Sequence, residues 1–162
     1  MMTSAPLILT VGIPGSGKST WAQTLVDKKP NYQIISTDSI RAQLYGDEAI
    51  QGEWMEIRRV LVQALKSARQ SIAQGHTAAV IYDATNAKRR QRREFIQLAR
   101  SCNYHPLIAA WIETPLAVCL QRNAERSRQV PPAIIEKMHR QLTAAPPTPE
   151  EGIDQILKIH HI

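Results

Sequence analysis

The sequence predicts an α/β protein built on a parallel sheet that helices cover on both faces. Two observations carry this prediction: short apolar runs alternate with helix-like stretches along the chain, and a glycine-rich turn separates the first such pair. A length of 162 residues suits one domain with a full core. Hydrophobic residues make up 43% and charged residues 21% of the chain, which excludes collagen-like, disordered and disulfide-scaffold classes. We therefore expect a single domain over residues 1–162.

The first half of the chain supplies two strands and three helices. Residues 7–11 form a short run that is apolar except for Thr10, which is typical of a buried strand. A helix is expected over residues 18–27, a second strand over residues 33–36, and a short helix starting near Asp38, a good N-cap residue. The longest helix is expected over residues 52–74, because apolar side chains recur there every three or four positions, at Trp54, Ile57, Leu61, Leu65, Ala68 and Ile72.

The second half continues the alternation. Residues 146–149 hold three prolines and are expected to form a rigid linker inside the domain. The further strands are expected at residues 78–82, 105–112 and 156–159, and the further helices at residues 88–101, after Pro115, and around Ile134, Ile135, Met138 and Leu142.

A phosphate-binding motif follows the first strand. Residues 12–19 match G-x-x-x-x-G-K-[ST] at every fixed position. Glycines let backbone N–H groups wrap a phosphate, Lys18 can bridge the β- and γ-phosphates, and the Ser19 hydroxyl can ligate Mg²⁺. A glycine-rich turn with a chance lysine is the alternative, but the strand before and the helix after favour the motif. We expect a nucleotide site formed by Gly12, Ile13, Pro14, Gly15, Ser16, Gly17, Lys18, Ser19 and Thr20.

Polar residues follow the second and third strands, on the side where parallel sheets bind ligands. Asp38 can accept a hydroxyl proton, and Arg41, three residues later, can hold an acceptor phosphate. The alternative is a helix cap with a solvated arginine. Asp83 can orient the Mg²⁺ shell, while Thr85 and Asn86 can line an acceptor pocket. Ordinary turn chemistry is the alternative for these three.

Two arginines follow the fourth strand. Arg122 and Arg126 are four residues apart and therefore face the same way on a helix. In the lids of small kinases such arginines stabilise charge on the transferring phosphoryl group. Charge spacing alone favours a solvated helix end that is partly paired through Glu125.

Together these motifs resemble the polynucleotide 5′-hydroxyl kinase family, as found in the bacteriophage end-healing enzyme and its bacterial counterparts. The resemblance rests on residues 12–19, 38–41, 83–86, 122–126 and 130–131, and covers nearly the whole chain in order. It implies an adenylate-kinase-like P-loop fold: three α/β/α layers, a five-stranded parallel sheet, and a small helical lid at about residues 115–145. The implied reaction transfers the γ-phosphate of ATP, with Mg²⁺, to a 5′-hydroxyl of RNA or DNA. The implied roles are general base for Asp38, acceptor ligand for Arg41, active-site acid for Asp83, and lid arginines for Arg122 and Arg126.

The acceptor stays open between three readings. Related P-loop kinases act on small hydroxylated metabolites or on seryl-tRNA. End-healing enzymes usually carry an additional phosphatase or ligase domain, which we do not expect within these 162 residues. A nucleotide-gated binding module is a further alternative, although such a switch needs no Asp38 base. The run 88–93 holds five cations that could neutralise a nucleic-acid backbone, or could form a solvated face. Aromatic residues for base stacking are scarce: Trp54 fits the core stripe better, and Tyr45 is a candidate near the acceptor.

Charge and cysteine usage add weaker expectations. A net charge of +6 favours anionic partners. Cys102 and Cys119 lack metal-ligand spacing and read as buried thiols in a reducing cytosol, so a cytoplasmic location is expected. Residues 1–9 lack a signal peptide pattern, and no apolar run reaches the roughly 20 residues of a membrane span. The pair at residues 160–161 is not expected to bind metal, and the sequence leaves the oligomeric state open.

Overall fold

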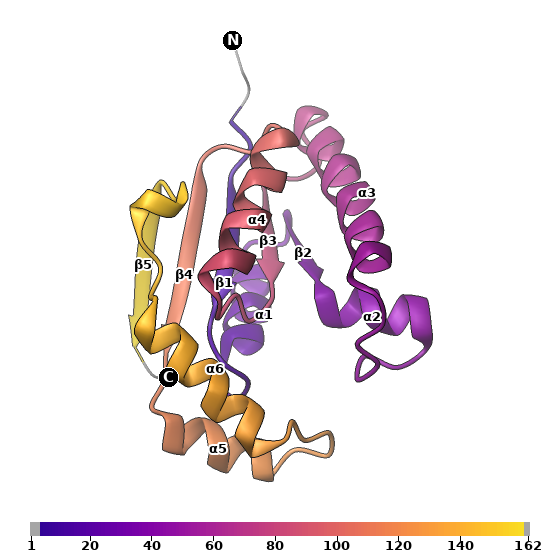
Figure 1. Ribbon diagram of the computed structural model, residues 1–162. Helices are drawn as coiled ribbons and strands as arrows, with labels where there is room; N and C mark the ends of the chain where they lie inside the picture. Colours follow the sequence, from indigo (N-terminus) through magenta and orange to yellow (C-terminus); the bar gives the residue numbers. More distant parts are fainter. Residues whose placement is uncertain (1–3, 161–162) are drawn as a thin grey trace.

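The computed structural model describes residues 4–160 (Figure 1). Within this range it contains five strands, six α-helices and one short 3₁₀ helix. The elements are β1 (Leu7–Val11), α1 (Lys18–Lys28), β2 (Tyr32–Ser36), α2 (Thr37–Tyr45), α3 (Trp54–Ala73), β3 (Ala79–Asp83), α4 (Arg89–Ser101), β4 (Leu107–Glu113), α5 (Leu116–Ala124), α6 (Pro132–Ala144), η1 (Pro149–Glu151) and β5 (Gln155–His160).

The five strands form one parallel sheet in the order β2-β3-β1-β4-β5, which confirms the predicted fold class. The fully buried β1 lies at its centre. Because the strands are parallel, β1, β2 and β3 all end at the same edge, where Ser36 is in register with Asp83. In open α/β sheets ligands bind beyond this carboxyl edge. The expected phosphate loop and the polar residues after β2 and β3 therefore meet there.

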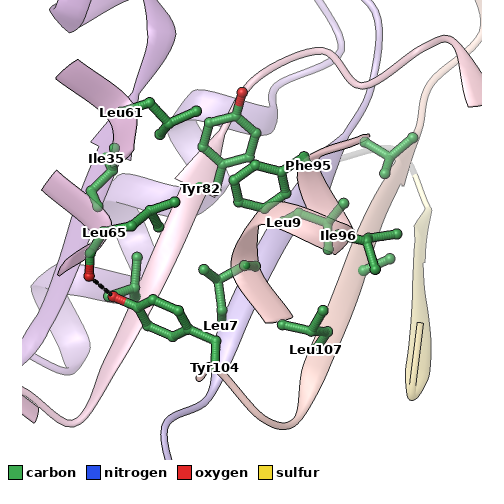
Figure 2. Packing of buried hydrophobic residues seen from close by; sticks show 14 of the residues in the cluster. Leu7, Leu9, Ile35, Leu61, Leu65, Tyr82, Phe95, Ile96, Tyr104 and Leu107 are labelled. Atoms are coloured by element: carbon green, nitrogen blue, oxygen red, sulfur yellow. Dashed lines mark hydrogen bonds between the residues drawn. The ribbon is translucent and has the colours of Figure 1, made fainter. Parts of the chain in front are cut away.

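Helices pack on both faces of the sheet (Figure 1). On one face Trp21 and Leu25 of α1 pack against Ile8 and Ile81. On the other face α3, α4 and α6 enclose the larger core. Figure 2 shows part of this core, including Leu61 and Leu65 of α3 and Phe95 and Ile96 of α4. The rings of Tyr82 and Phe95 stack there with their centroids 3.7 Å apart, so that β3 and α4 are held together.

One assignment on α3 is wrong. The buried stripe of this helix begins at Ile57 and continues through Leu61 and Leu65, whereas Trp54 is 48% exposed. Trp54 lines the cleft beyond the carboxyl ends of the strands, where the sheet does not cover it. The periodicity of the helix was predicted correctly, but it extends one turn past the core.

The basic run 88–93 also differs from expectation at one position. Arg92 is fully buried and donates from Nε to Glu151 Oε1 at 2.6 Å. Its guanidinium also donates to the carbonyls of Asn86, Ala87 and Ala145. Arg92 therefore ties α4 to the end of α6 and to η1, and cannot meet a nucleic-acid backbone.

A smaller correction concerns the start of α2. Ser36, not Asp38, caps α2: its hydroxyl accepts the Ser39 N–H at 3.0 Å, and Asp38 lies in the first turn. No helix within residues 4–160 combines the length and apolar character needed to cross a membrane. The predictions for residues 1–3 and for His161 fall outside the described part of the chain.

Candidate active site

The loop between β1 and α1 forms a cradle of the shape that the motif requires. Gly15 has φ +85°, and a Cβ there would lie 2.5 Å from the Cys119 carbonyl oxygen, so only glycine fits. Among the described residues no side chain caps α1, and its first turn holds no acid. The buried Ser16 Oγ likewise finds no partner within residues 4–160. The uncapped backbone N–H groups at the start of α1 and the Ser16 hydroxyl are hydrogen-bond donors that fit an anionic ligand such as a nucleotide phosphate.

Ser19, Asp83 and Lys18 meet beside this loop. The Ser19 hydroxyl donates to Asp83 Oδ2 at 2.7 Å, and Lys18 Nζ is 4.0 Å from Asp83 Oδ1. Thr10 of β1 holds the same carboxylate at 3.1 Å. A hydroxyl and a single carboxylate are oxygen ligands that suit Mg²⁺, which usually takes its remaining ligands from water and substrate phosphates. The residues present therefore fit Mg²⁺.

Asp38 and Arg41 form an ion pair that lines the same cleft. Arg41 Nε also donates to the Glu48 carbonyl at 3.1 Å, which fixes the guanidinium. Arg128 approaches from the α5–α6 loop: its Nη1 is 2.9 Å from Glu48 Oε1 and 3.9 Å from Asp38 Oδ2. The predicted pair is thus brought together, with a second cation, Arg128, beside it.

Sequence reasoning missed Arg128 and Glu48. Arg128 belongs to the same basic cluster as Arg122 and Arg126, so its charge was a signal that could have been used. Glu48 lies between α2 and α3, and nothing in its local sequence marks it.

The two predicted lid arginines take different positions. Arg122 Nη1 donates to the carbonyl oxygens of Gly15 at 3.2 Å and Ser16 at 3.4 Å, so α5 is fastened to the phosphate loop. Arg126 is exposed and lines the cleft. Between them the buried Asn123 amide binds both backbone groups of Val130, at 2.7 and 2.9 Å. This clamp closes the loop that carries Arg126.

Thr85 and Asn86 line the cleft, but their hydrogen bonds join the segment after β3 to β1 and the start of the phosphate loop. The Thr85 carbonyl accepts the Gly12 N–H at 2.9 Å, and Asn86 Nδ2 donates to the Thr10 carbonyl at 2.8 Å. Asn86 is almost fully buried, so its amide is committed to β1. A role in acceptor binding stays a prediction for both residues.

One cleft of about 1390 Å³ joins these groups. It exceeds the roughly 300–1,000 Å³ typical of a site for one small ligand. Of the site residues expected from the sequence, those that line the cleft are Pro14, Gly15, Gly17, Lys18, Ser19, Thr20, Asp38, Arg41, Asp83, Thr85, Asn86, Arg122 and Arg126. Gly12, Ile13 and Ser16 of the same loop are buried. Lys88 reaches the cleft, while Arg89, Arg90 and Arg93 line a separate hollow on α4.

Comparison with known proteins yields a family and two relatives. The family model described as "AAA domain" matches residues 7–145. An L-seryl-tRNA(Sec) kinase from Methanococcus maripaludis is 26% identical over 137 residues, covering 82% of this chain and 51% of that protein. A bifunctional polynucleotide kinase/RNA ligase of the Autographa californica nuclear polyhedrosis virus is 27% identical over 153 residues, covering 85% of this chain and 21% of that protein. The chain therefore spans about half the length of the first relative and about a fifth of the second.

A solved structure shares the architecture. One chain in the structure of the Pnkp1/Rnl/Hen1 RNA repair complex superposes with a TM-score of 0.73 at 22% identity. The match covers 95% of this chain and 48% of that one. At this identity the likeness shows a common fold.

Proposed function

The chain belongs to this AAA-domain family of P-loop kinases, and on that premise we propose that it transfers the γ-phosphate of ATP to the 5′-hydroxyl end of a polynucleotide. The observation that carries the proposal is the pair of Asp38 and Arg41, which faces the same cleft as Lys18 and Asp83. A nucleotide-gated switch needs the phosphate side of this cleft only. A kinase needs both sides, because it must also hold an acceptor and remove its proton.

Different residues act on the two substrates, ATP and the acceptor. Backbone N–H groups at the start of α1 and the Lys18 ammonium bind the phosphates of ATP. Ser19 and Asp83 would hold Mg²⁺, which neutralises charge on the phosphate oxygens when bound. Arg41 orients the acceptor, and Asp38 accepts the proton of its 5′-hydroxyl. The hydroxyl oxygen bonds to the γ-phosphorus as the bond to the β–γ bridging oxygen breaks, and ADP leaves. Arg126 lies on the cleft wall, where a cation can stabilise the transferring group.

Three observations support a polynucleotide as the acceptor. The cleft has room for an acceptor beside the nucleotide. Four cations, Lys88, Arg89, Arg90 and Arg93, remain exposed at the start of α4. Of the two relatives reported above, one is named as a polynucleotide kinase/RNA ligase and the other as a kinase of seryl-tRNA.

A phosphate-transfer panel tests the proposal. The protein is incubated with Mg²⁺ and γ-labelled ATP and with 5′-hydroxyl RNA, 5′-hydroxyl DNA, seryl-tRNA or small polyols. We expect label on the 5′-hydroxyl oligonucleotides and none with the Lys18→Ala variant. Label on seryl-tRNA or a polyol alone would assign a different acceptor. ATP hydrolysis without transfer to any acceptor would support the switch instead.

Salt dependence tests the contribution of α4. Each neutralised phosphate of a single strand adds about −0.7 to the slope of log affinity against log salt, so two or three contacts cost about seven- to twenty-fold between about 50 and 200 mM. We expect the triple replacement of Arg89, Arg90 and Arg93 with Gln to flatten this slope and to leave the KM for ATP unchanged. The matched control removes three exposed cations that lie outside α4 and line neither the cleft nor the hollow on α4, namely Lys28, Lys29 and Lys66. Equal slopes in both variants would show that α4 is a solvated face.

A further inference from the structure

Trp54 is a large aromatic side chain that the fold leaves uncovered in the cleft. It is the first residue of α3, it is 48% exposed, and it lines the same cleft as Asp38 and Arg41. The next position of the core-facing stripe of this helix, Ile57, is buried. An aromatic ring at the acceptor side of a kinase cleft presents a flat apolar face to whatever binds there.

Contacts with Tyr45 hold the start of α3, which carries Trp54, in place. The Tyr45 hydroxyl accepts the Glu53 N–H and donates to Glu56 Oε2, both at 3.3 Å, so the end of α2 is bonded to residues on either side of Trp54. The Tyr45 ring packs against the backbone of Gly52, where a Cβ would lie 2.2 Å from it. These contacts fix the start of α3, so Trp54 stands at a defined place on the cleft wall.

A cation accompanies the ring. Arg58 is four residues after Trp54 and therefore lies on the same side of α3, and it is exposed and lines the cleft as well. An aromatic ring with a neighbouring arginine is the combination that single-stranded nucleic acid binds, because bases stack on the ring and the cation meets the phosphates. Met55, on the next position of the helix, is 68% exposed but does not line the cleft.

We propose that Trp54 is the stacking platform for the base of the acceptor's 5′-terminal nucleotide, with Arg58 placed toward the phosphate that follows. This rests on the proposed polynucleotide kinase function. The 5′-hydroxyl must reach Asp38, and the base of the same nucleotide must then lie elsewhere on the cleft wall. Trp54 supplies a flat apolar surface on that wall. Stacking accepts any base, because every base has a π-face, so the platform selects nucleotides over polyols without selecting a sequence.

The test compares two acceptors that differ only in the terminal base. One is a 5′-hydroxyl oligonucleotide, and the other carries an abasic 5′-terminal residue that keeps the hydroxyl. KM and kcat for transfer are measured with both acceptors for the wild type, Trp54→Ala, Trp54→Phe and Met55→Ala. Base stacking is worth enough to favour the complete acceptor by about 5- to 150-fold in kcat/KM. We expect Trp54→Ala to lose this preference, Trp54→Phe to keep most of it, and Met55→Ala to match the wild type.

The outcomes separate this inference from the proposed function. If wild type phosphorylates the complete oligonucleotide and Trp54→Ala keeps the full preference for it over the abasic acceptor, the stacking role is wrong while the kinase function stands. An equal loss with Trp54→Ala and Met55→Ala would likewise overturn it, because the effect would then come from the helix start as a whole. If the wild type phosphorylates neither oligonucleotide, the proposed function itself fails and the platform with it.

Discussion

Replacing Glu151 with Gln should cost far more stability than an ordinary charge change. The Arg92 and Glu151 side chains are 0% and 2% exposed, and two hydrogen bonds of 2.6 and 3.3 Å join them. Gln removes the negative charge and leaves a buried guanidinium surrounded by neutral carbonyls. Removing one partner of a buried ion pair typically costs about 3–5 kcal/mol of unfolding free energy. For a chain of this size that loss lowers Tm by about 6–20 °C.

The measurement is urea unfolding followed by circular dichroism, with Glu94→Gln as the matched control. Glu94 pairs with Arg90 on the same helix, but the two side chains are 53% and 90% exposed, so its loss should cost no more than about 0.5 kcal/mol. The double change Arg92→Met with Glu151→Met should recover much of the lost stability, because no charge then stays buried. A loss for Glu151→Gln no larger than for Glu94→Gln would refute this reasoning.

Three further results are expected. Asp38→Asn should keep ATP affinity in equilibrium binding and lose at least a hundredfold in kcat, because an amide cannot accept the acceptor's proton; unchanged kcat would remove the general-base role. Gly15→Ala should weaken ATP binding at least tenfold by calorimetry, since its Cβ meets the Cys119 carbonyl at 2.5 Å; wild-type affinity would mean that the loop tolerates the side chain. Although partial burial opposes ionisation, the Leu107 N–H and the Arg100 guanidinium hold the pKa of Asp154 below its usual value, so this stabilisation is present above about pH 4 and is lost as pH falls through the folded-state pKa. The urea midpoint should therefore fall with acid more steeply in wild type than in Asp154→Asn, and parallel curves would contradict the assignment.

The sequence predicted the fold because its signals are local. A mostly apolar strand, a glycine-rich turn and a helix starting at Lys18 appear within residues 7–28, and alternation along the rest of the chain implies a parallel sheet. Parallel strands end at one edge, so Asp38 and Asp83 were expected on the side of the phosphate loop. The structure brings both to that cleft.

The errors arose where tertiary packing decides the environment of a side chain. Arg92 looks like its neighbours Arg90 and Arg93 in sequence, and only the arrival of Glu151 from 59 residues away makes it a core residue. Trp54 continues an apolar stripe, and only the length of the sheet leaves it uncovered. A periodic pattern gives the face of a helix but not where the surface beneath it ends.

The two hydrogen bonds between Asn123 and Val130 have a consequence for how the proposed acceptor site can be altered. The side chain of Asn123 makes two hydrogen bonds to the backbone of Val130. These bonds hold together the two ends of the segment 124–129, whatever its sequence. Surface loops whose ends are fixed tolerate changes of length and sequence well. The segment is therefore the natural place to graft new acceptor contacts, since it carries Arg126 and Arg128 over the cleft while α5 stays fastened to the phosphate loop.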